Sequence, residues 1–212
     1  MSGPAIKICG INAAVALDAA IAARADYAGL VFYPPSPRHL TPSEAADLGA
    51  RAAGRIGAVG LFVDADDSTI GDAVGAAKLQ AVQLHGRESP QRAAELRARF
   101  GVPVWKVIAV ASATDIARAD AYAGGADLIL FDAKTPKGTL PGGMGLVFDW
   151  ALLSAYRGAL PWGLAGGLSI DNVAEAVRVT GATLVDTSSG VESAPGVKDV
   201  DKIAAFCKAA RP

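Results

Sequence analysis

Short apolar segments alternate along this chain with alanine-rich segments whose apolar positions recur at helical spacing. The apolar segments are rich in Val, Ile and Leu, as expected for strands that are buried in a parallel sheet. Eight of them are predicted strands, at 5–9, 27–32, 56–63, 81–85, 102–110, 126–132, 160–166 and 182–187. The alternation predicts an α/β protein in which helices connect parallel strands.

Three of the intervening segments begin with helix-start signals. The stretch TPSE at 41–44 has the form of a capping box with proline at the first helical position. Serine opens two more segments, at 89–90 and at 112–115, in a similar way. We expect every connection between strands to be helical.

The number of strand–helix units points to one fold within the α/β class. Eight units close a (β/α)8 TIM barrel, and 212 residues lie near the lower limit of that fold. No linker divides the chain, so we predict a single barrel domain over 1–212. The alternative is an open doubly wound sheet, but its glycine fingerprint is missing from CGINAAVA at 9–16, directly after the first strand.

Composition narrows the class of function. The formal net charge is −1, with acidic and basic residues mixed, which gives no basis for a nucleic-acid or membrane partner. The two cysteines, Cys9 and Cys207, form neither a metal motif nor a disulfide framework, and Cys207 is expected to pack in the last helix. No signal peptide or membrane-spanning run is evident. We expect a soluble, cytoplasmic enzyme or small-molecule binding protein without a metal.

Polar residues stand where predicted strands end, on the face that would line a barrel. Barrel strands alternate between the interior and the helix layer. Alternation places six polar residues inside, namely Lys7, Cys9, Gln83, His85, Asp132 and Asp186. Because barrel active sites form at the carboxyl ends of the strands, we predict the site there. Taken singly, Cys9 also fits a small buried hydrophobe, and either aspartate also fits a cap of the next loop.

Three loops add to this picture. The stretches LAGGLS (164–169) and TSSGVES (187–193) follow the seventh and eighth strands, where barrels often bind phosphate through backbone N–H groups. The proline-rich loop at 32–42 carries Arg38, whose planar fork suits a carboxylate, although a solvated surface arginine is the simpler interpretation. The loop at 132–148 is long enough to be a lid.

Together these stretches resemble the phosphoribosylanthranilate isomerase family of tryptophan biosynthesis. The motifs KICG, FYPPSPR, QLHG, FDAKTP, FDW, LAGGL and SSGVE occur in the family's order and cover nearly the whole chain. One departure is Met144, where the family often has serine or threonine, and it affects only a minor loop contact.

The resemblance implies a barrel that performs an Amadori rearrangement with no metal or organic cofactor. N-(5-phosphoribosyl)anthranilate becomes 1-(2-carboxyphenylamino)-1-deoxyribulose 5-phosphate. By the same resemblance Cys9 is the general base, Asp132 is the general acid and Arg38 holds the anthranilate carboxylate. The remaining site residues are Gly166, Gly167, Ser189 and Gly190 at the phosphate and Asp186 beside the substrate, and we expect His85 to contact the substrate too.

A base at Cys9 needs a thiolate, whereas a free thiol has a pKa of roughly 8.5. Lys7 lies on the same predicted inner face, so we expect its ammonium to favour the thiolate.

The sequence leaves two alternative functions and two oligomeric states to be decided. The histidine-pathway isomerase performs the same rearrangement on another phosphoribosyl substrate, but it is expected to have an aspartate where this chain has Cys9. A non-catalytic phosphosugar-binding barrel would keep the glycine-rich loops and need neither Cys9 nor Asp132. A monomer and a homodimer both fit the sequence.

Overall fold

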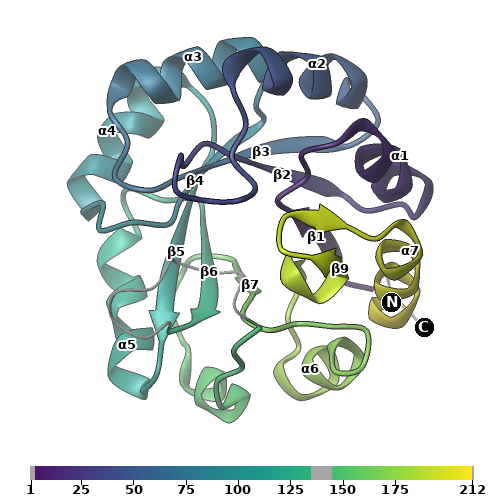
Figure 1. Cartoon of the computed structure of the whole chain (residues 1–212). Coiled ribbons are helices and arrows are strands. Elements are labelled where there is room, and N and C mark those ends of the chain that lie inside the picture. The colour runs from purple at the N-terminus through teal and green to yellow at the C-terminus, as the bar shows by residue number, and fades with distance from the viewer. Residues whose placement is uncertain (1–2, 135–144, 212) are drawn as a thin grey trace.

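The computed structural model describes residues 3–134 and 145–211. Eight parallel strands close into a barrel in chain order, surrounded by helices (Figure 1). The strands are β1 (Ala5–Cys9), β2 (Tyr27–Val31), β3 (Gly57–Phe62), β4 (Ala81–Leu84), β5 (Val104–Val110), β6 (Leu128–Ala133), β7 (Trp162–Leu164) and β8 (Leu184–Thr187). Because β1 pairs with β8, the sheet has no open edge, and the predicted (β/α)8 barrel is confirmed.

Three of the helices, those that follow Thr41, Ser89 and Ser112, begin where the sequence signals predict. The helices are α1 (Ala14–Ala22), α2 (Pro42–Ala52), α3 (Asp67–Ala77), α4 (Pro90–Phe100), α5 (Ala113–Ala117), α6 (Val173–Thr180) and α7 (Val200–Ala210), with 3-10 turns η1 (Arg118–Tyr122), η2 (Trp150–Ala155) and η3 (Ser189–Val191). Thr41 and Glu44 form a capping box, Ser89 caps α4, and Ser112 precedes α5. Among the described residues no helix is both long and apolar enough to cross a bilayer.

The connection from β6 to β7 departs from the expectation of helical crossovers. Between residues 145 and 161 it contains only the 3-10 turn η2. Aromatic side chains cover the outer face of β6 there, because Tyr156 and Trp162 pack on Phe131 with ring centroids 5.2 and 5.9 Å apart. The loop proposed as a lid, and Met144 with it, falls mostly outside the described residues.

The two faces of the barrel strands separate as alternation predicts. The inner cluster consists of Val59, Ala81, Trp105, Val107, Leu130 and Leu184. The outer faces pack against the helices and include Ile6, Ile8, Val82, Leu84, Ile129, Phe131 and Val185. Cys207 is buried in this outer layer on α7, as expected. The apolar side chains therefore fill the amino-terminal part of the barrel interior, and the polar residues lie at the carboxyl ends of the strands.

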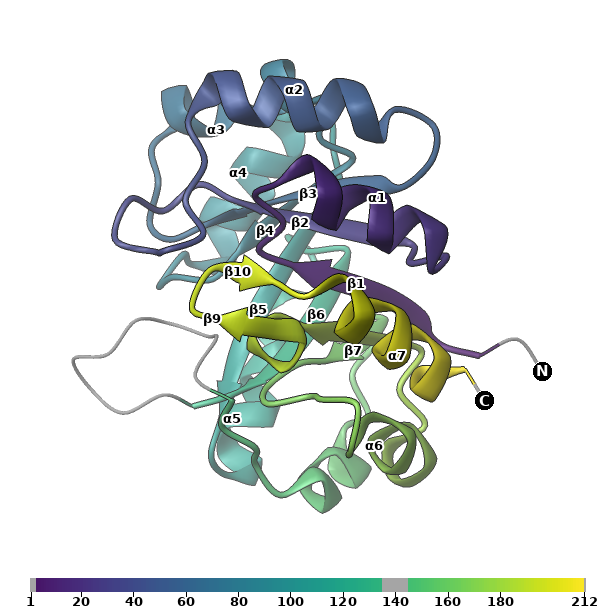
Figure 2. The same cartoon turned by 45° about the vertical axis from the view of Figure 1, so that its right-hand side comes forward.

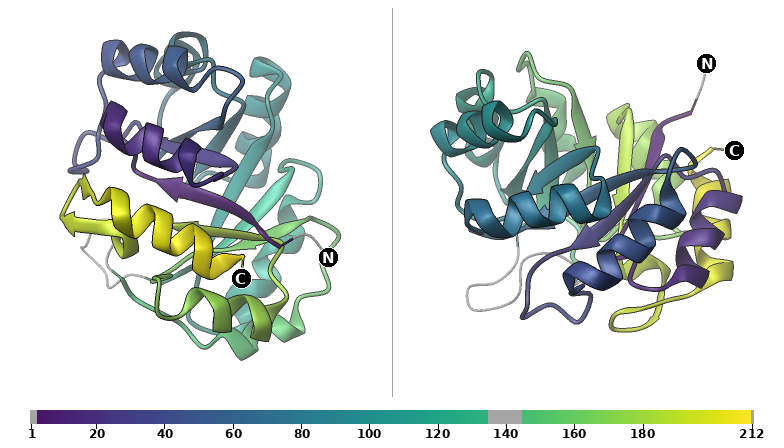
Figure 3. Two further views of the ribbon diagram at one scale, coloured as in Figure 1. Left: turned by 90° about the vertical axis from the view of Figure 1, so that its right-hand side faces the viewer. Right: turned by 90° about the horizontal axis from the view of Figure 1, so that it is seen from above.

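A small hairpin that the sequence pattern did not predict follows η3. It is formed by β9 (Glu192–Ala194) and β10 (Val197–Lys198), which pair antiparallel and appear in yellow in Figure 2. The two ends of the described chain lie side by side (Figure 3). Arg211 Nε donates a hydrogen bond of 2.8 Å to the Pro4 carbonyl, which ties α7 to the start of β1.

Candidate active site

A pocket of ≈ 220 Å³ opens at the carboxyl ends of the strands. Nine of the residues singled out from the sequence line it: Cys9, Arg38, Gln83, His85, Asp132, Gly166, Gly167, Asp186 and Ser189. Gly190, predicted at the phosphate, is not among the lining residues. A Cβ at Gly190 would collide with the Leu168 carbonyl, so this glycine allows the loops after β7 and β8 to pack together.

Cys9 lies next to a buried ion pair. Lys7 is 0 % exposed and its Nζ contacts both carboxylate oxygens of Asp186 at 3.0 Å, because register places the two residues side by side on β1 and β8. Gly29 on β2 faces this group. A Cβ there would lie 2.9 Å from Cys9 Sγ and 3.0 Å from Lys7 Nζ, so only glycine leaves room for both side chains.

Burial and charge act against each other on this group. Burial raises the pKa of the Cys9 thiol, and the Lys7 ammonium opposes that shift without overcoming it. Burial also disfavours the Lys7 ammonium, but the adjoining Asp186 carboxylate and Cys9 raise the pKa of Lys7 overall, which keeps it charged. Lys7 therefore acts in the expected direction, while the resting Cys9 remains a thiol.

The predicted acid stands across the pocket beside a histidine. Asp132 Oδ1 accepts a hydrogen bond of 2.8 Å from the backbone N–H of Ala133, and His85 Nε2 lies 3.3 Å from Asp132 Oδ2. Gln83 and His85 both line the pocket, and neither Gln83 Oε1 nor His85 Nδ1 has a hydrogen-bond partner among the described residues. Both of these atoms are buried, and His85 contacts Asp132 through its other ring nitrogen.

The two glycine-rich loops meet at one side of the pocket. The Thr187 hydroxyl donates to the Leu168 carbonyl at 2.7 Å, which joins the end of β8 to the loop after β7. Asn172 bridges that loop by accepting from Ser169 N–H at 2.8 Å and donating to the Gly167 carbonyl at 2.9 Å. Backbone held in this way can present N–H groups to an anion.

Arg38 reaches the pocket from the loop after β2, but two of its nitrogens are engaged. Its Nε and one Nη donate to the Glu192 carboxylate at 2.7 and 2.8 Å. Lys198 Nζ binds the same carboxylate at 2.6 Å and the Ser188 carbonyl at 3.0 Å. Reasoning from the sequence missed Glu192 and Lys198, although Glu192 belongs to the SSGVE motif.

Comparison with known proteins identifies the family. Residues 6–209 match the family model described as N-(5′-phosphoribosyl)anthranilate (PRA) isomerase. The chain belongs to this isomerase family. A relative from Paramagnetospirillum magneticum named N-(5′-phosphoribosyl)anthranilate isomerase is 55% identical over 97% of this chain and 96% of its own length.

Solved structures of phosphoribosylanthranilate isomerases share the fold over the same length. The enzyme from Thermotoga maritima is 36% identical and superposes with a TM-score of 0.88 over 98% of each chain. A second structure, in complex with reduced 1-(o-carboxyphenylamino)-1-deoxyribulose 5-phosphate, is 34% identical with a TM-score of 0.85, again over 98% of each chain. The family that the sequence motifs resemble is therefore confirmed.

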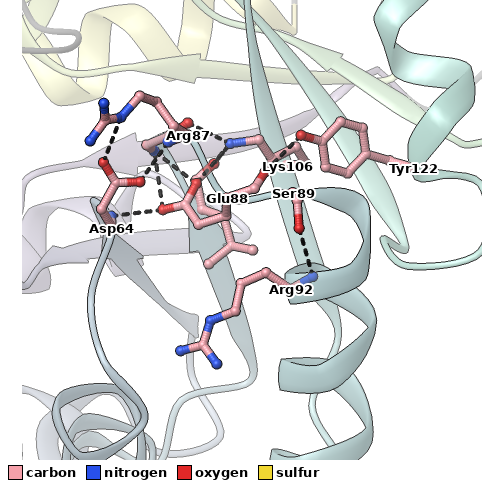
Figure 4. Close-up of polar contacts among 9 residues, drawn as sticks. Asp64, Arg87, Glu88, Ser89, Arg92, Lys106 and Tyr122 are labelled. Carbon is pink, nitrogen blue, oxygen red and sulfur yellow. Dashed lines mark hydrogen bonds and ion pairs between the residues drawn. The ribbon is translucent and has the colours of Figure 1, made fainter.

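In this family member a second buried charge cluster lies outside the pocket and holds the loop after β4 (Figure 4). The Glu88 carboxylate accepts from Lys106 Nζ at 2.8 Å and from the backbone N–H of Asp64 at 2.9 Å. The Tyr122 hydroxyl donates to the Glu88 carbonyl at 2.7 Å. These bonds fix the loop directly after His85, so the cluster supports the histidine that contacts Asp132.

No group of His, Cys, Asp and Glu side chains within 3–134 and 145–211 is arranged to hold a metal ion. The charged groups in the pocket instead pair with each other.

Proposed function

We propose that this chain converts N-(5-phosphoribosyl)anthranilate into 1-(2-carboxyphenylamino)-1-deoxyribulose 5-phosphate, with Cys9 as general base and Asp132 as general acid. Family membership supports the reaction, a step of tryptophan biosynthesis. One observation supports the residue roles above all others. Cys9 and Asp132 line the same pocket from β1 and β6, which β7 and β8 separate in the barrel.

The proposed chemistry needs one proton donor and one proton acceptor. Asp132 gives its proton to the ribose ring oxygen, the bond from that oxygen to C1 breaks, and the nitrogen lone pair forms a C=N bond. Cys9, in the thiolate form that the Lys7 ammonium favours, then takes the proton from C2. The electrons of the C2–H bond form the C1=C2 bond of an enolamine, and the π electrons of the C=N bond return to nitrogen. The hydroxyl proton of the enolamine moves to C1, which leaves a ketone at C2.

The rest of the pocket suits the rest of this substrate. Its apolar wall can cover an aromatic ring, and it is formed by Val31, Tyr33, Leu61, Val63 and Pro195. Arg38 has further N–H donors beyond those engaged with Glu192, and these suit the ring carboxylate. Gly166, Gly167 and Ser189 are proposed to bind the phosphate. His85 and Asp186 are proposed to lie beside the sugar.

Single substitutions at the two proposed catalytic residues test these roles. We expect Cys9→Ala and Asp132→Asn each to lower kcat by about 10²–10⁴-fold, because each removes one partner of the proton transfer. The assay follows the loss of substrate fluorescence with phosphoribosylanthranilate generated in place. Cys207→Ala, which removes the other thiol, is the matched control and should retain activity.

Binding of the reduced product analogue, measured by calorimetry, separates catalysis from folding. Both inactive variants should still bind it. Full turnover by either variant would refute its assigned role. Failure of the wild type to turn over this substrate, with binding intact, would instead favour the histidine-pathway substrate or a non-catalytic binding barrel.

The same proposal covers assembly and location. Both buried cysteines are free thiols, which fits the reducing cytoplasm. We infer one barrel domain that acts as a monomer or a homodimer on a small phosphoribosyl substrate. A dimeric form is named for the Thermotoga maritima relative. Sedimentation of the purified protein measures the state of this chain.

A further inference from the structure

We propose that Glu192 is a positioning residue that holds Arg38 toward the carboxylate of the substrate and holds Lys198 on the phosphate loop, so that it determines specificity for a carboxylated aromatic amine. This inference rests on the proposed role of Arg38. It adds a residue that touches neither the sugar nor the reacting atoms.

The contacts of Glu192 make it the centre of a charge cluster that three segments share. Arg38 comes from the loop after β2, Glu192 from β9 and Lys198 from β10. One Glu192 oxygen accepts from Arg38 Nε at 2.7 Å and from Lys198 Nζ at 2.6 Å, and the other accepts from an Arg38 Nη at 2.8 Å. Two hydrogen bonds from Glu192 thus hold one edge of the guanidinium. The N–H groups of the other Nη, on the opposite edge, are left to bind the substrate carboxylate.

The backbone around this cluster is shaped to fit Arg38. Gly10 directly follows Cys9 with φ +79°, and a Cβ there would collide with Arg38 Cδ. At the turn of the hairpin, a Cβ on Gly196 would lie 2.6 Å from the Pro37 carbonyl oxygen. The hairpin therefore packs closely on the loop that carries Arg38, and the Arg38 side chain crosses the end of β1.

Lys198 connects this cluster to the phosphate side of the pocket. Its Nζ, fully buried, contacts both the carbonyl and the hydroxyl of Ser188, at 3.0 and 3.2 Å. Ser188 and Ser189 line the pocket in the loop after β8. One carboxylate therefore fixes the cation proposed for the ring carboxylate and the cation that holds the phosphate loop.

Charge explains why these cations need an anion of their own. Asp132 and Asp186 line the same pocket, and both are proposed to act on the substrate. A guanidinium freed from Glu192 has these carboxylates as alternative partners, and it also regains its rotamer freedom, which binding must then remove. Loss of the Glu192 charge should therefore weaken recognition of the substrate carboxylate, although the pocket becomes more positive.

The test compares two substrates that differ only in the carboxylate, phosphoribosylanthranilate and N-(5-phosphoribosyl)aniline. For Glu192→Gln we expect KM for the first to rise about tenfold, the size of one charged hydrogen bond, with kcat changed less than about twofold. KM for the aniline compound should rise much less, because that compound loses only the support that Lys198 gives to the phosphate loop. Arg38→Met should show the same selectivity and a larger effect. Chromatography measures turnover of both compounds.

Lys202→Met is the matched control, because Lys202 Nζ binds the Glu192 backbone carbonyl at 2.8 Å and not the carboxylate. It should leave both KM values unchanged, and thermal unfolding checks that each variant is folded. If Glu192→Gln raises KM equally for the two substrates, Glu192 only stabilises the loops, and the inference is overturned. If Arg38→Met is selective and Glu192→Gln is not, this inference alone fails. If Arg38→Met is not selective, the proposed role of Arg38 fails first.

Discussion

At the scale of single residues, the neighbours of Cys9 decide what its thiol can do. The Lys7 ammonium and the Asp186 carboxylate are buried beside it and act on its proton in opposite directions. Lys7 favours the thiolate, whereas burial and the Asp186 charge favour the thiol. The cluster contains one cation, Lys7, and two acidic groups, Cys9 and Asp186. Lys7 balances the charge of one anion, whereas ionising the second acidic group costs free energy because the group is buried.

Titration of Cys9 tests this arrangement. Because burial raises the pKa of the thiol, the rate of alkylation by iodoacetamide should still be rising above pH 9.0. Lys7→Met should slow alkylation at a fixed pH by about tenfold. Asp186→Asn should speed it, since Lys7 is then left with Cys9 as its acidic partner.

The measurement uses the Cys207→Ala background, although burial also raises the pKa of Cys207 to about 11 and keeps that thiol slow. Circular dichroism confirms that each variant is folded before alkylation. Shifts in the same direction for both variants, or none for Lys7→Met, would contradict the account.

At the scale of elements, strand and helix boundaries follow local chemistry. Strands β1 and β8 end at the pocket residues Cys9 and Thr187, and His85 and Asp132 lie within one residue of the ends of β4 and β6. Helix α2 starts at a reciprocal cap, in which Glu44 N–H donates to the Thr41 hydroxyl while Thr41 N–H donates to the Glu44 carboxylate at 2.8 Å. This cap lies just after the loop that carries Arg38, so it also fixes the end of that loop.

Removal of this cap has a defined expected cost. Thr41→Ala should lower the free energy of unfolding by about 1 kcal/mol, because the N-terminal N–H groups of α2 lose their acceptor. Thr41→Ser keeps a hydroxyl and should cost much less. Urea unfolding measures both, and kcat should be unchanged in each variant. A Thr41→Ala protein as stable as the wild type would show that the cap is energetically neutral.

At the scale of the whole molecule, Glu192 joins parts of the chain that are distant in sequence. Its carboxylate holds Arg38 and Lys198, and its carbonyl holds Lys202 on α7. Burial acts to raise the pKa of Glu192, but the hydrogen bonds from Arg38 and Lys198 outweigh it and lower the pKa below 4.5, the ordinary value. The carboxylate is therefore charged at neutral pH and contributes to the stability of the closed barrel.

This contribution should depend on pH with a definite sign. A lowered pKa means that the stabilisation is complete well above pH 4.5 and is lost as the pH falls through the lower value of the folded state. At pH 7 we expect Glu192→Gln to be less stable than the wild type by about 1–3 kcal/mol. The difference should shrink in acid. Denaturant unfolding across this range measures it, and a difference that does not change with pH would rule out the charge as its source.

The sequence alone was sufficient for those features that depend on near neighbours along the chain. Periodicity placed the eight strands to within a few residues, and alternation correctly separated the outward Ile6 and Ile8 from the inward Lys7 and Cys9. Three helix starts were readable from their caps, because a cap involves residues three positions apart. The shared direction of parallel strands then brought Cys9 and Asp132 to one end of the barrel.

Only the tertiary structure decided the pairings between distant loops. Arg38 and Glu192 are 154 residues apart, and no local pattern indicates that two of the Arg38 nitrogens bind a carboxylate of the protein itself. The same holds for Lys7 with Asp186, which meet because β1 and β8 close the barrel. The charge state of Cys9 depends on burial, and burial results from the whole fold. The sequence by itself therefore determined most of the residues that gather at the pocket, because strand direction and alternation are local properties. Closure of the barrel decided which of their charged groups form pairs.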